Sequence, residues 1–74
     1  MNREIHCTLH NHPETLERVL QVIRIRGFQL QHLEAQQQNR KLLLNLSVTS
    51  ERPLDNLVQQ LRKLVDMCSL QVLA

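Results

Sequence analysis

Residues that commonly mark a catalytic, metal or nucleic-acid site are scarce in this sequence of 74 residues. A single glycine excludes a glycine-rich phosphate-binding loop. The two cysteines, Cys7 and Cys68, form no C-x-x-C pair, so nothing supports a thiolate metal site or a redox motif. We interpret both as small buried hydrophobes on neighbouring strands, where they could touch.

Charge of one sign and long apolar runs are also missing. The formal net charge is +2 with scattered basic residues, whereas a nucleic-acid-binding protein usually carries a basic stripe. No apolar run approaches the ~20 residues of a transmembrane helix. Residues 1–12 are polar and alternating, unlike a signal peptide. We therefore expect a cytoplasmic protein that binds neither nucleic acid nor membranes.

The sequence is instead rich in aliphatic residues, with 15 leucines, six valines and three isoleucines. These must build the core, because Phe28 is the only aromatic residue. The length predicts one domain over residues 1–74. Such a small core barely offsets a chain entropy of roughly 1.5 kcal/mol per ordered residue, which favours a stable partner or self-association.

A first helix is predicted over residues 13–26. Pro13 suits the first helical position, and Asn11 or His12 then becomes the N-cap. Asn11 and Glu14 also have the spacing of a capping box.

The body and the end of this helix are marked as well. Glu14 and Arg18 can form an i,i+4 ion pair. Gly27 stands where a left-handed residue ends a helix. One face is apolar at helical spacing and consists of Leu16, Val19, Leu20 and Ile23.

Four segments alternate with period two, as strands with one buried face do; they are residues 3–10, 28–36, 41–49 and 68–73. In the second segment the apolar parity changes between Leu30 and Leu33. We therefore predict a β-bulge near Gln31 or His32, and an edge position for this strand. Residues 36–40 are wholly polar and predict a turn whose type the sequence leaves open.

A second helix begins near Pro53, with Ser50 or Arg52 as its cap depending on where Pro53 falls. Its end is expected near Asp66. Its apolar stripe has helical spacing and consists of Leu54, Leu57, Val58, Leu61, Leu64 and Val65.

The resulting order is β-α-β-β-α-β, an α+β pattern typical of the ferredoxin-like fold. Right-handed crossovers place both helices on one face of a four-stranded antiparallel sheet, with the first and third strands central. The other face of the sheet is expected to carry Glu4, His6, Thr8, Leu43, Asn45 and Ser47.

No arrangement of residues supports catalysis or a metal site, so we predict neither. His6 and His10 share a strand face, but four strand residues separate them by about 13 Å, too far for one ion. His10 and His12 are nearer, yet no third ligand is evident. RNA-binding modules of this topology stack bases on aromatics of the central strands, and these strands have none.

Binding of a small molecule or a protein remains. The turn over residues 10–13 leads into a helix N-terminus, whose free N–H groups and dipole favour a carboxylate. The alternative is that Asn11 merely caps its helix. The bulged edge strand is a natural docking seam for another chain.

Three blocks of the sequence carry a family likeness: Asn-His-Pro-Glu-Thr-Leu-Glu-Arg-Val-Leu at residues 11–20, Arg-Ile-Arg-Gly-Phe at 24–28 and Leu-Arg-Lys-Leu-Val-Asp at 61–66. With these blocks the sequence resembles an ACT domain, and more narrowly the small regulatory subunits of acetolactate synthase of the isozyme II type. The first block is the most specific. That subunit type is short, with no second domain, and the end of the chain at Ala74 agrees with it.

The resemblance implies a non-catalytic chain that associates with a large subunit carrying thiamine diphosphate, Mg²⁺ and FAD. The large subunit condenses pyruvate with pyruvate or 2-ketobutyrate in branched-chain amino-acid biosynthesis, and the small subunit raises its activity. Such domains also pair side by side into a homodimer through an edge strand. A free-standing homodimeric amino-acid sensor without an enzyme partner is the alternative.

The resemblance also implies where an effector would bind, at Asn11, His12, Pro13 and Glu14 with His32 and Leu33 of the second strand. Effector-binding relatives usually have glycine after the proline, and here that place is Glu14. Its side chain and negative charge oppose an amino-acid carboxylate, so we expect weak or absent valine binding.

Contacts with the large subunit are expected from exposed apolar side chains. The candidates are Val22 and Ile25 on the first helix and Leu43 on the open face of the sheet.

Overall fold

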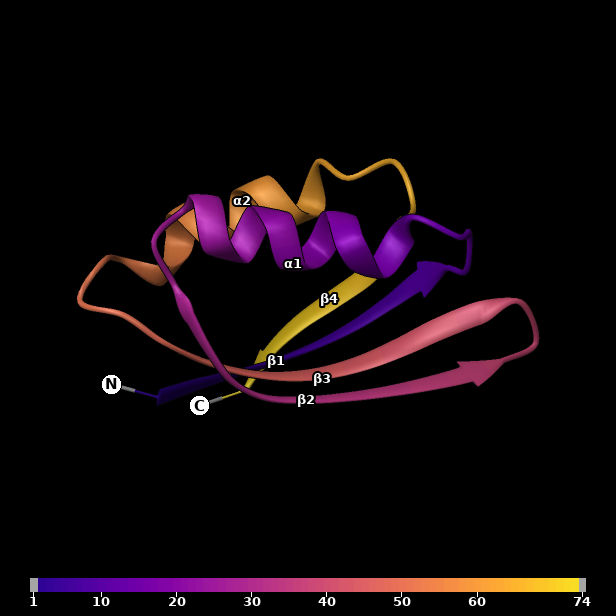
Figure 1. The fold of residues 1–74 in the computed structure, drawn as a ribbon, viewed down its shortest axis with the longest axis horizontal. Coiled ribbons are helices and arrows are strands. Elements are labelled where there is room, and N and C mark those ends of the chain that lie inside the picture. The colour runs from indigo at the N-terminus through magenta and orange to yellow at the C-terminus, as the bar shows by residue number, and fades with distance from the viewer. Residues whose placement is uncertain (1, 74) are drawn as a thin grey trace.

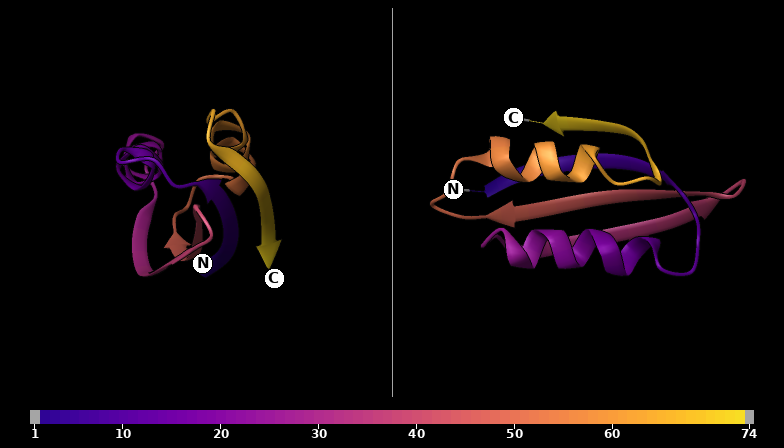
Figure 2. Two further views of the ribbon diagram at one scale, coloured as in Figure 1. Left: turned by 90° about the vertical axis from the view of Figure 1, so that its right-hand side faces the viewer. Right: turned by 90° about the horizontal axis from the view of Figure 1, so that it is seen from above.

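The computed structural model describes residues 2–73, which form the predicted succession of strands and helices. The elements are β1 (Asn2–His10), α1 (Thr15–Ile25), β2 (Gln29–Gln38), β3 (Lys41–Thr49), α2 (Leu54–Arg62) and β4 (Met67–Leu73). Both helices lie on one side of an antiparallel sheet (Figure 1), and they run side by side across it when seen from above (Figure 2). The strand order is β2-β3-β1-β4, so the first and third strands are central, as predicted.

The core lies between the sheet and the two helices. Alternation puts every second residue of β1 and β3 on the inner face, as the period-two pattern predicted. The buried apolar side chains of the strands are Ile5, Cys7, Leu9, Leu42, Leu44, Leu46 and Val48, and those of the helices are Val19, Ile23, Leu57 and Leu61. Aliphatic packing therefore holds the helices on the sheet.

The predicted bulge on β2 is confirmed at Gln31. The pairing of β2 with β3 steps from Leu30 opposite Val48 to His32 opposite Ser47, which leaves Gln31 as the extra residue. This step restores Leu33 to the inner face, where it lies opposite Leu46 and packs against the core.

A second bulge, which the sequence did not predict, lies on the other edge strand. The pairing of β4 with β1 steps from Ser69 opposite Thr8 to Met67 opposite Leu9, so Cys68 is the extra residue. Cys68 is therefore exposed, and the interpretation as a buried hydrophobe is wrong for it but confirmed for Cys7, which is 2% exposed.

The expected approach of the two cysteines is also wrong. Cys7 lies opposite Leu70 on β4, while the Cys68 sulfur contacts Lys41 of β3.

The turn between β2 and β3 is shorter than the predicted span of residues 36–40. The polar residues 36–38 continue β2, and the turn consists of Asn39 and Arg40, with φ of 51° and 65°. Two successive positive φ angles are the requirement of a type I′ hairpin. Polar residues fit here because the last residues of this edge strand are exposed to solvent.

The N-terminal boundary of α1 corrects the prediction. The helix starts at Thr15, Glu14 occupies the N-cap position without a side-chain cap hydrogen bond, and Pro13 belongs to the turn before it. The capping box of Asn11 and Glu14 is therefore wrong. The predicted ion pair is confirmed, since Arg18 Nη2 lies 2.9 Å from Glu14 Oε2.

The C-terminal end of α1 confirms the prediction for Gly27, whose φ is 82°. The N–H of Phe28 donates to the Ile23 carbonyl over 3.0 Å, and the N–H of Gly27 donates to the Arg24 carbonyl over 3.1 Å. These two bonds form a Schellman motif, which uses carbonyls that the helix leaves free.

The boundaries of α2 differ from the prediction at both ends. Pro53 occupies the N-cap position with φ of −60° and ψ of 135°, so neither Ser50 nor Arg52 caps the helix. The helix ends at Arg62 rather than near Asp66, and Val65 is 87% exposed instead of continuing the apolar stripe.

Candidate functional site

The connection between β1 and α1, residues 11–14, carries the predicted effector residues and is called the first connection below. It lies at the end of the molecule where the β2–β3 hairpin also turns (Figure 1). Backbone bonds fix both of its sides: the N–H of Asn11 donates to the Arg40 carbonyl over 3.0 Å, and the N–H of His10 donates to the Asp66 carbonyl over 2.8 Å. The connection is thus tied to the hairpin and to the residue before β4.

Thr15, the first residue of α1, is the centre of a buried hydrogen-bond network. Its hydroxyl oxygen accepts the N–H of His12 over 3.1 Å. Its single proton faces two acceptors, each 3.0 Å away, the His10 carbonyl and the Asp66 carboxylate oxygen Oδ2. The other carboxylate oxygen of Asp66 lies 3.5 Å from His12 Nε2. Asp66 is 8% exposed, so its charge depends on these partners.

Three backbone donors at the first connection, those of Asn11, His12 and Thr15, are therefore used within the chain. The N–H of His12 serves the Thr15 hydroxyl and the His10 carbonyl, and the N–H of Thr15 donates to the His12 carbonyl over 3.1 Å. An anion at a helix N-terminus needs free N–H groups. The arrangement favours the alternative reading of the sequence, a turn bonded within the chain, although Thr15 rather than Asn11 is its central residue.

Two surface hollows flank the first connection. One, of about 270 Å³, is lined by His12, Pro13, Glu14, Arg18 and Asp66. Its two carboxylates repel a ligand carboxylate, and its arginine is already paired with Glu14.

The other hollow, of about 330 Å³, shares His12 and Pro13 with the first. It combines the amide side chains of Asn11 and Gln37 with the apolar Leu16 and Leu42. This surface suits an aliphatic group beside a hydrogen-bonding group better than it suits a carboxylate.

The structure does not bring all the predicted effector residues together within one chain. Asn11 to Glu14 form one connection, whereas His32 and Leu33 lie on β2 next to its bulge. Gln37, the β2 residue beside Asn11, follows His32 by five strand residues, or about 17 Å.

The three predicted partner contacts differ in exposure. Ile25 is 63% exposed, as expected for a contact residue. Leu43 is half-buried on the open face of β3. Val22 is half-buried and packs against the core, so its placement among exposed helix positions is wrong.

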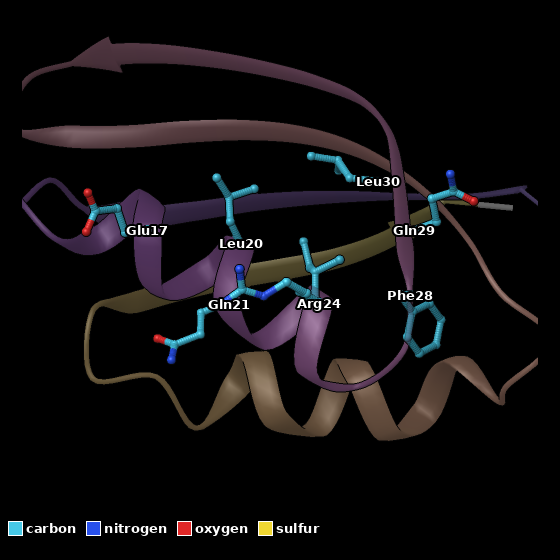
Figure 3. A pocket seen from close by; sticks show the side chains of 8 residues that line it. Glu17, Leu20, Gln21, Arg24, Phe28, Gln29 and Leu30 are labelled. Atoms are coloured by element: carbon cyan, nitrogen blue, oxygen red, sulfur yellow. The ribbon is translucent and has the colours of Figure 1, made fainter.

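A larger hollow, of about 610 Å³, was not predicted. It lies between α1 and the start of β2 (Figure 3). Leu20, Phe28 and Leu30 give it an apolar floor, and Glu17 and Arg24 of α1 stand at its sides. It adjoins the bulged edge strand.

Among residues 2–73, no three histidine, cysteine, aspartate or glutamate side chains are grouped closely enough to hold a metal ion, and the ring centroids of His10 and His12 are 6.4 Å apart. Neither α1 nor α2 has the length and the hydropathy that crossing a lipid bilayer requires.

Sequence reasoning missed Thr15 and Asp66, the residues that fix the first connection. A signal for Asp66 existed in the topology: the start of the last strand pairs with the end of the first, so a carboxylate placed just before β4 must lie beside His10. Thr15 carried no comparable signal, because threonine is common at helix starts.

Comparison with known proteins gives a consistent picture. The family profile of the ACT domain matches residues 11–70. The chain is 36% identical over 74 residues to the acetolactate synthase isozyme 2 small subunits of Escherichia coli K12 and Shigella flexneri, covering 97% of this chain and 85% of each relative.

Among solved structures, the ACT domain from the GTP pyrophosphokinase of Chlorobium tepidum superposes with a TM-score of 0.86 at 15% identity, covering 99% of this chain and 97% of that chain. A homoserine dehydrogenase from Thiobacillus denitrificans superposes with a TM-score of 0.70 at 12% identity, over 97% of this chain and 17% of that chain. At such identities the likeness concerns the fold alone. The chain belongs to the ACT-domain family, where its similarity is to acetolactate synthase small subunits and its role is regulatory rather than catalytic.

Proposed function

We propose that this chain, a single ACT domain over residues 1–74, is the activating small subunit of a cytoplasmic acetolactate synthase of the isozyme II type. In this proposal it assembles with a large catalytic subunit, which carries thiamine diphosphate, Mg²⁺ and FAD. The product of that enzyme enters branched-chain amino-acid biosynthesis. The observation that carries the proposal is the 36% identity over 97% of the chain to small subunits of this enzyme.

Weak or absent valine binding is the second part of the proposal. Glu14 follows Pro13 in the first connection, with its side chain 70% exposed and paired with Arg18. Asp66 adds a second carboxylate to the same hollow. With the N–H groups of His12 and Thr15 already bonded, a valine carboxylate would meet negative charge with fewer backbone donors to compensate for it.

A homodimer through β2 completes the proposal. Gln31 and the exposed residues that follow it form an open strand edge, and the apolar hollow containing Leu20 and Leu30 lies beside it. A second copy along this edge would extend the sheet and cover the hollow.

Reconstitution tests the proposal directly. The full chain is added to the isolated large subunit, and acetolactate formation is measured with and without valine, leucine and isoleucine. We expect a rise in activity that none of the three amino acids reverses. A pull-down from native extract that yields only the chain itself would favour the free-standing sensor instead.

Variants at Glu14 separate its charge from its bulk. Calorimetry with valine should show no binding for the wild type, little for Glu14→Gln and measurable binding for Glu14→Gly, because only glycine removes the side chain from the hollow. Glu17→Gln is the matched control, a loss of one charge one turn further along α1. Tight valine binding by the wild type would overturn this part of the proposal.

Ile25→Glu tests the partner surface. Because Ile25 is 63% exposed, the substitution should change the free energy of unfolding by less than about 0.5 kcal/mol while weakening assembly with the large subunit. Val22→Glu on the same helix is the contrast, since it places a charge against the core and should unfold the domain. Full activation of the large subunit by the Ile25→Glu variant would show that Ile25 does not lie at the interface with the large subunit.

A further inference from the structure

A cluster of three reactive side chains from three strands lies at the end of the sheet, outside the proposed effector and partner surfaces. Lys41 Nζ of β3 lies 3.2 Å from Cys68 Sγ of β4 and 3.4 Å from His10 Nδ1 of β1. A lysine ammonium can only donate, so the Nδ1 atom of His10 accepts. Lys41 therefore reaches across the end of the intervening β1 to touch the sulfur.

The bulge is what makes this contact available. As the extra residue of β4, Cys68 leaves the inner face and is exposed to solvent. The chain contains its own contrast in Cys7, which is 2% exposed and opposite Leu70. Burial raises the pKa of the Cys7 thiol from 9.0 to about 11, which disfavours the nucleophilic thiolate there.

We propose that Cys68 and Lys41 form an oxidation-sensitive pair, in which hydrogen peroxide oxidises the sulfur and the lysine nitrogen then closes a reversible S–N cross-link. The inference does not depend on the proposed function, because it uses this chain alone.

The first step is oxidation of the sulfur. The Cys68 thiolate attacks one peroxide oxygen, an S–O bond forms, the O–O bond breaks, and a proton from solvent completes the departing water. Sulfur loses two electrons to the peroxide and becomes a sulfenic acid.

The second step is condensation without further redox change. The Lys41 ammonium gives one proton to His10 Nδ1, and the resulting amine attacks the Cys68 sulfur. An S–N bond forms, the S–O bond breaks, and the hydroxyl leaves as water with the second amine proton. Sulfenic acids are known to condense with nitrogen in this way, and a thiol reverses the product.

The consequence is a covalent clip over the start of the first connection. The clip would join β3 to β4 across His10, whose N–H is bonded to the Asp66 carbonyl. The bridge would add a covalent link beside the hydrogen bonds of Thr15 and His12, which it leaves in place.

The test is peptide mapping of the full chain after treatment with limiting hydrogen peroxide. Mass spectrometry without reduction should find the peptides containing Lys41 and Cys68 joined, with two hydrogen atoms fewer than their sum and no tryptic cleavage after Lys41. Dithiothreitol should release both peptides. Dimedone, which traps sulfenic acid, should label Cys68 little and Cys7 not at all.

Variants make the test specific. Lys41→Met removes the primary amine together with its positive charge, whereas Lys41→Arg removes the primary amine and keeps a positive charge. Both variants should abolish the cross-link and raise dimedone labelling of Cys68 severalfold. Lys63→Met, at the other lysine of the chain, should behave as the wild type. Equal dimedone labelling with and without Lys41, a disulfide between two copies of Cys68, or oxidation mainly at Cys7 would each overturn the proposal.

Discussion

The two strand-to-helix connections occupy equivalent places in the two halves of the fold, at opposite ends of the molecule (Figure 1), but they are held differently. The first connection depends on the buried Thr15 and Asp66, which are 51 residues apart. The second connection, residues 50–53, depends on an exposed hydroxyl: Ser50 Oγ accepts the N–H of Arg52 over 2.9 Å and donates to the Gly27 carbonyl over 3.3 Å.

The difference shows how one topology can give two loops of unequal rigidity. Neither helix has a side-chain N-cap. In the first half the helix start is instead tied through the Thr15 hydroxyl to the Asp66 carboxylate just before β4, and burial makes each bond costly to lose. In the second half water can replace the partner of Ser50, so that connection can open at lower cost.

The largest expected effect tests this comparison directly. Thr15→Val keeps the shape of the side chain but leaves the Asp66 carboxylate without its hydroxyl donor, so it should lower the free energy of unfolding by about 1–3 kcal/mol. Ser50→Ala removes the corresponding hydroxyl of the second connection and should cost about 0.5–1 kcal/mol. Urea unfolding measures both, and an equal or larger loss for Ser50→Ala would break the comparison.

Alkaline pH should lower the free energy of unfolding through a residue of the sheet beneath both connections. It should therefore affect the two connections equally. The pKa of Cys7 is about 11 in the folded chain against 9.0 for the unfolded chain. Between these values the unfolded chain has released the proton while the folded chain retains it. Stability is therefore complete below pH 9 and falls as the pH rises towards 11, by on the order of 2 kcal/mol.

The control for this pH effect is Cys7→Val, which should remove that part of the alkaline loss. The difference in free energy of unfolding between Thr15→Val and Ser50→Ala should be the same at pH 7 and pH 10. If this difference disappears at pH 10, the stability of the two connections is not independent of the sheet.

A further prediction concerns Gly27, whose carbonyl accepts the Ser50 hydroxyl of the second connection. Gly27→Ala places a Cβ at φ of 82°, a left-handed conformation that costs an L-residue about 1–2 kcal/mol. The new Cβ would also lie 2.8 Å from Arg52 Nε, but that flexible side chain can move away. Gly27→Asn should lose less, because asparagine tolerates this conformation. Thermal unfolding that ranks alanine above asparagine in stability would contradict the explanation.

Much of the fold followed from local patterns. Period-two and helical spacing located all six elements, the single glycine marked the end of α1, and the parity change after Leu30 located the bulge at Gln31. Each of these features is decided by residues within a few positions of one another.

The features that the sequence did not predict are decided by distant partners. Asp66 reaches Thr15 only after β4 has paired with β1, so a local capping rule chose Asn11 wrongly. The bulge at Cys68 was missed because Cys68, Leu70 and Val72 were taken as one unbroken alternation, whereas the structure packs Met67 and Leu70 against the core. Packing of the finished sheet determines both.

The two bulges have a consequence for how this domain meets other chains. One interrupts each edge of the sheet, Gln31 on β2 and Cys68 on β4, so neither border offers an unbroken row of backbone donors and acceptors. A neighbouring strand could pair with residues 32–38, but its register would be interrupted at the bulge. The bulges therefore oppose further edge-to-edge pairing beyond a pair of molecules, which protects a small leucine-rich protein from aggregation through its sheet edges.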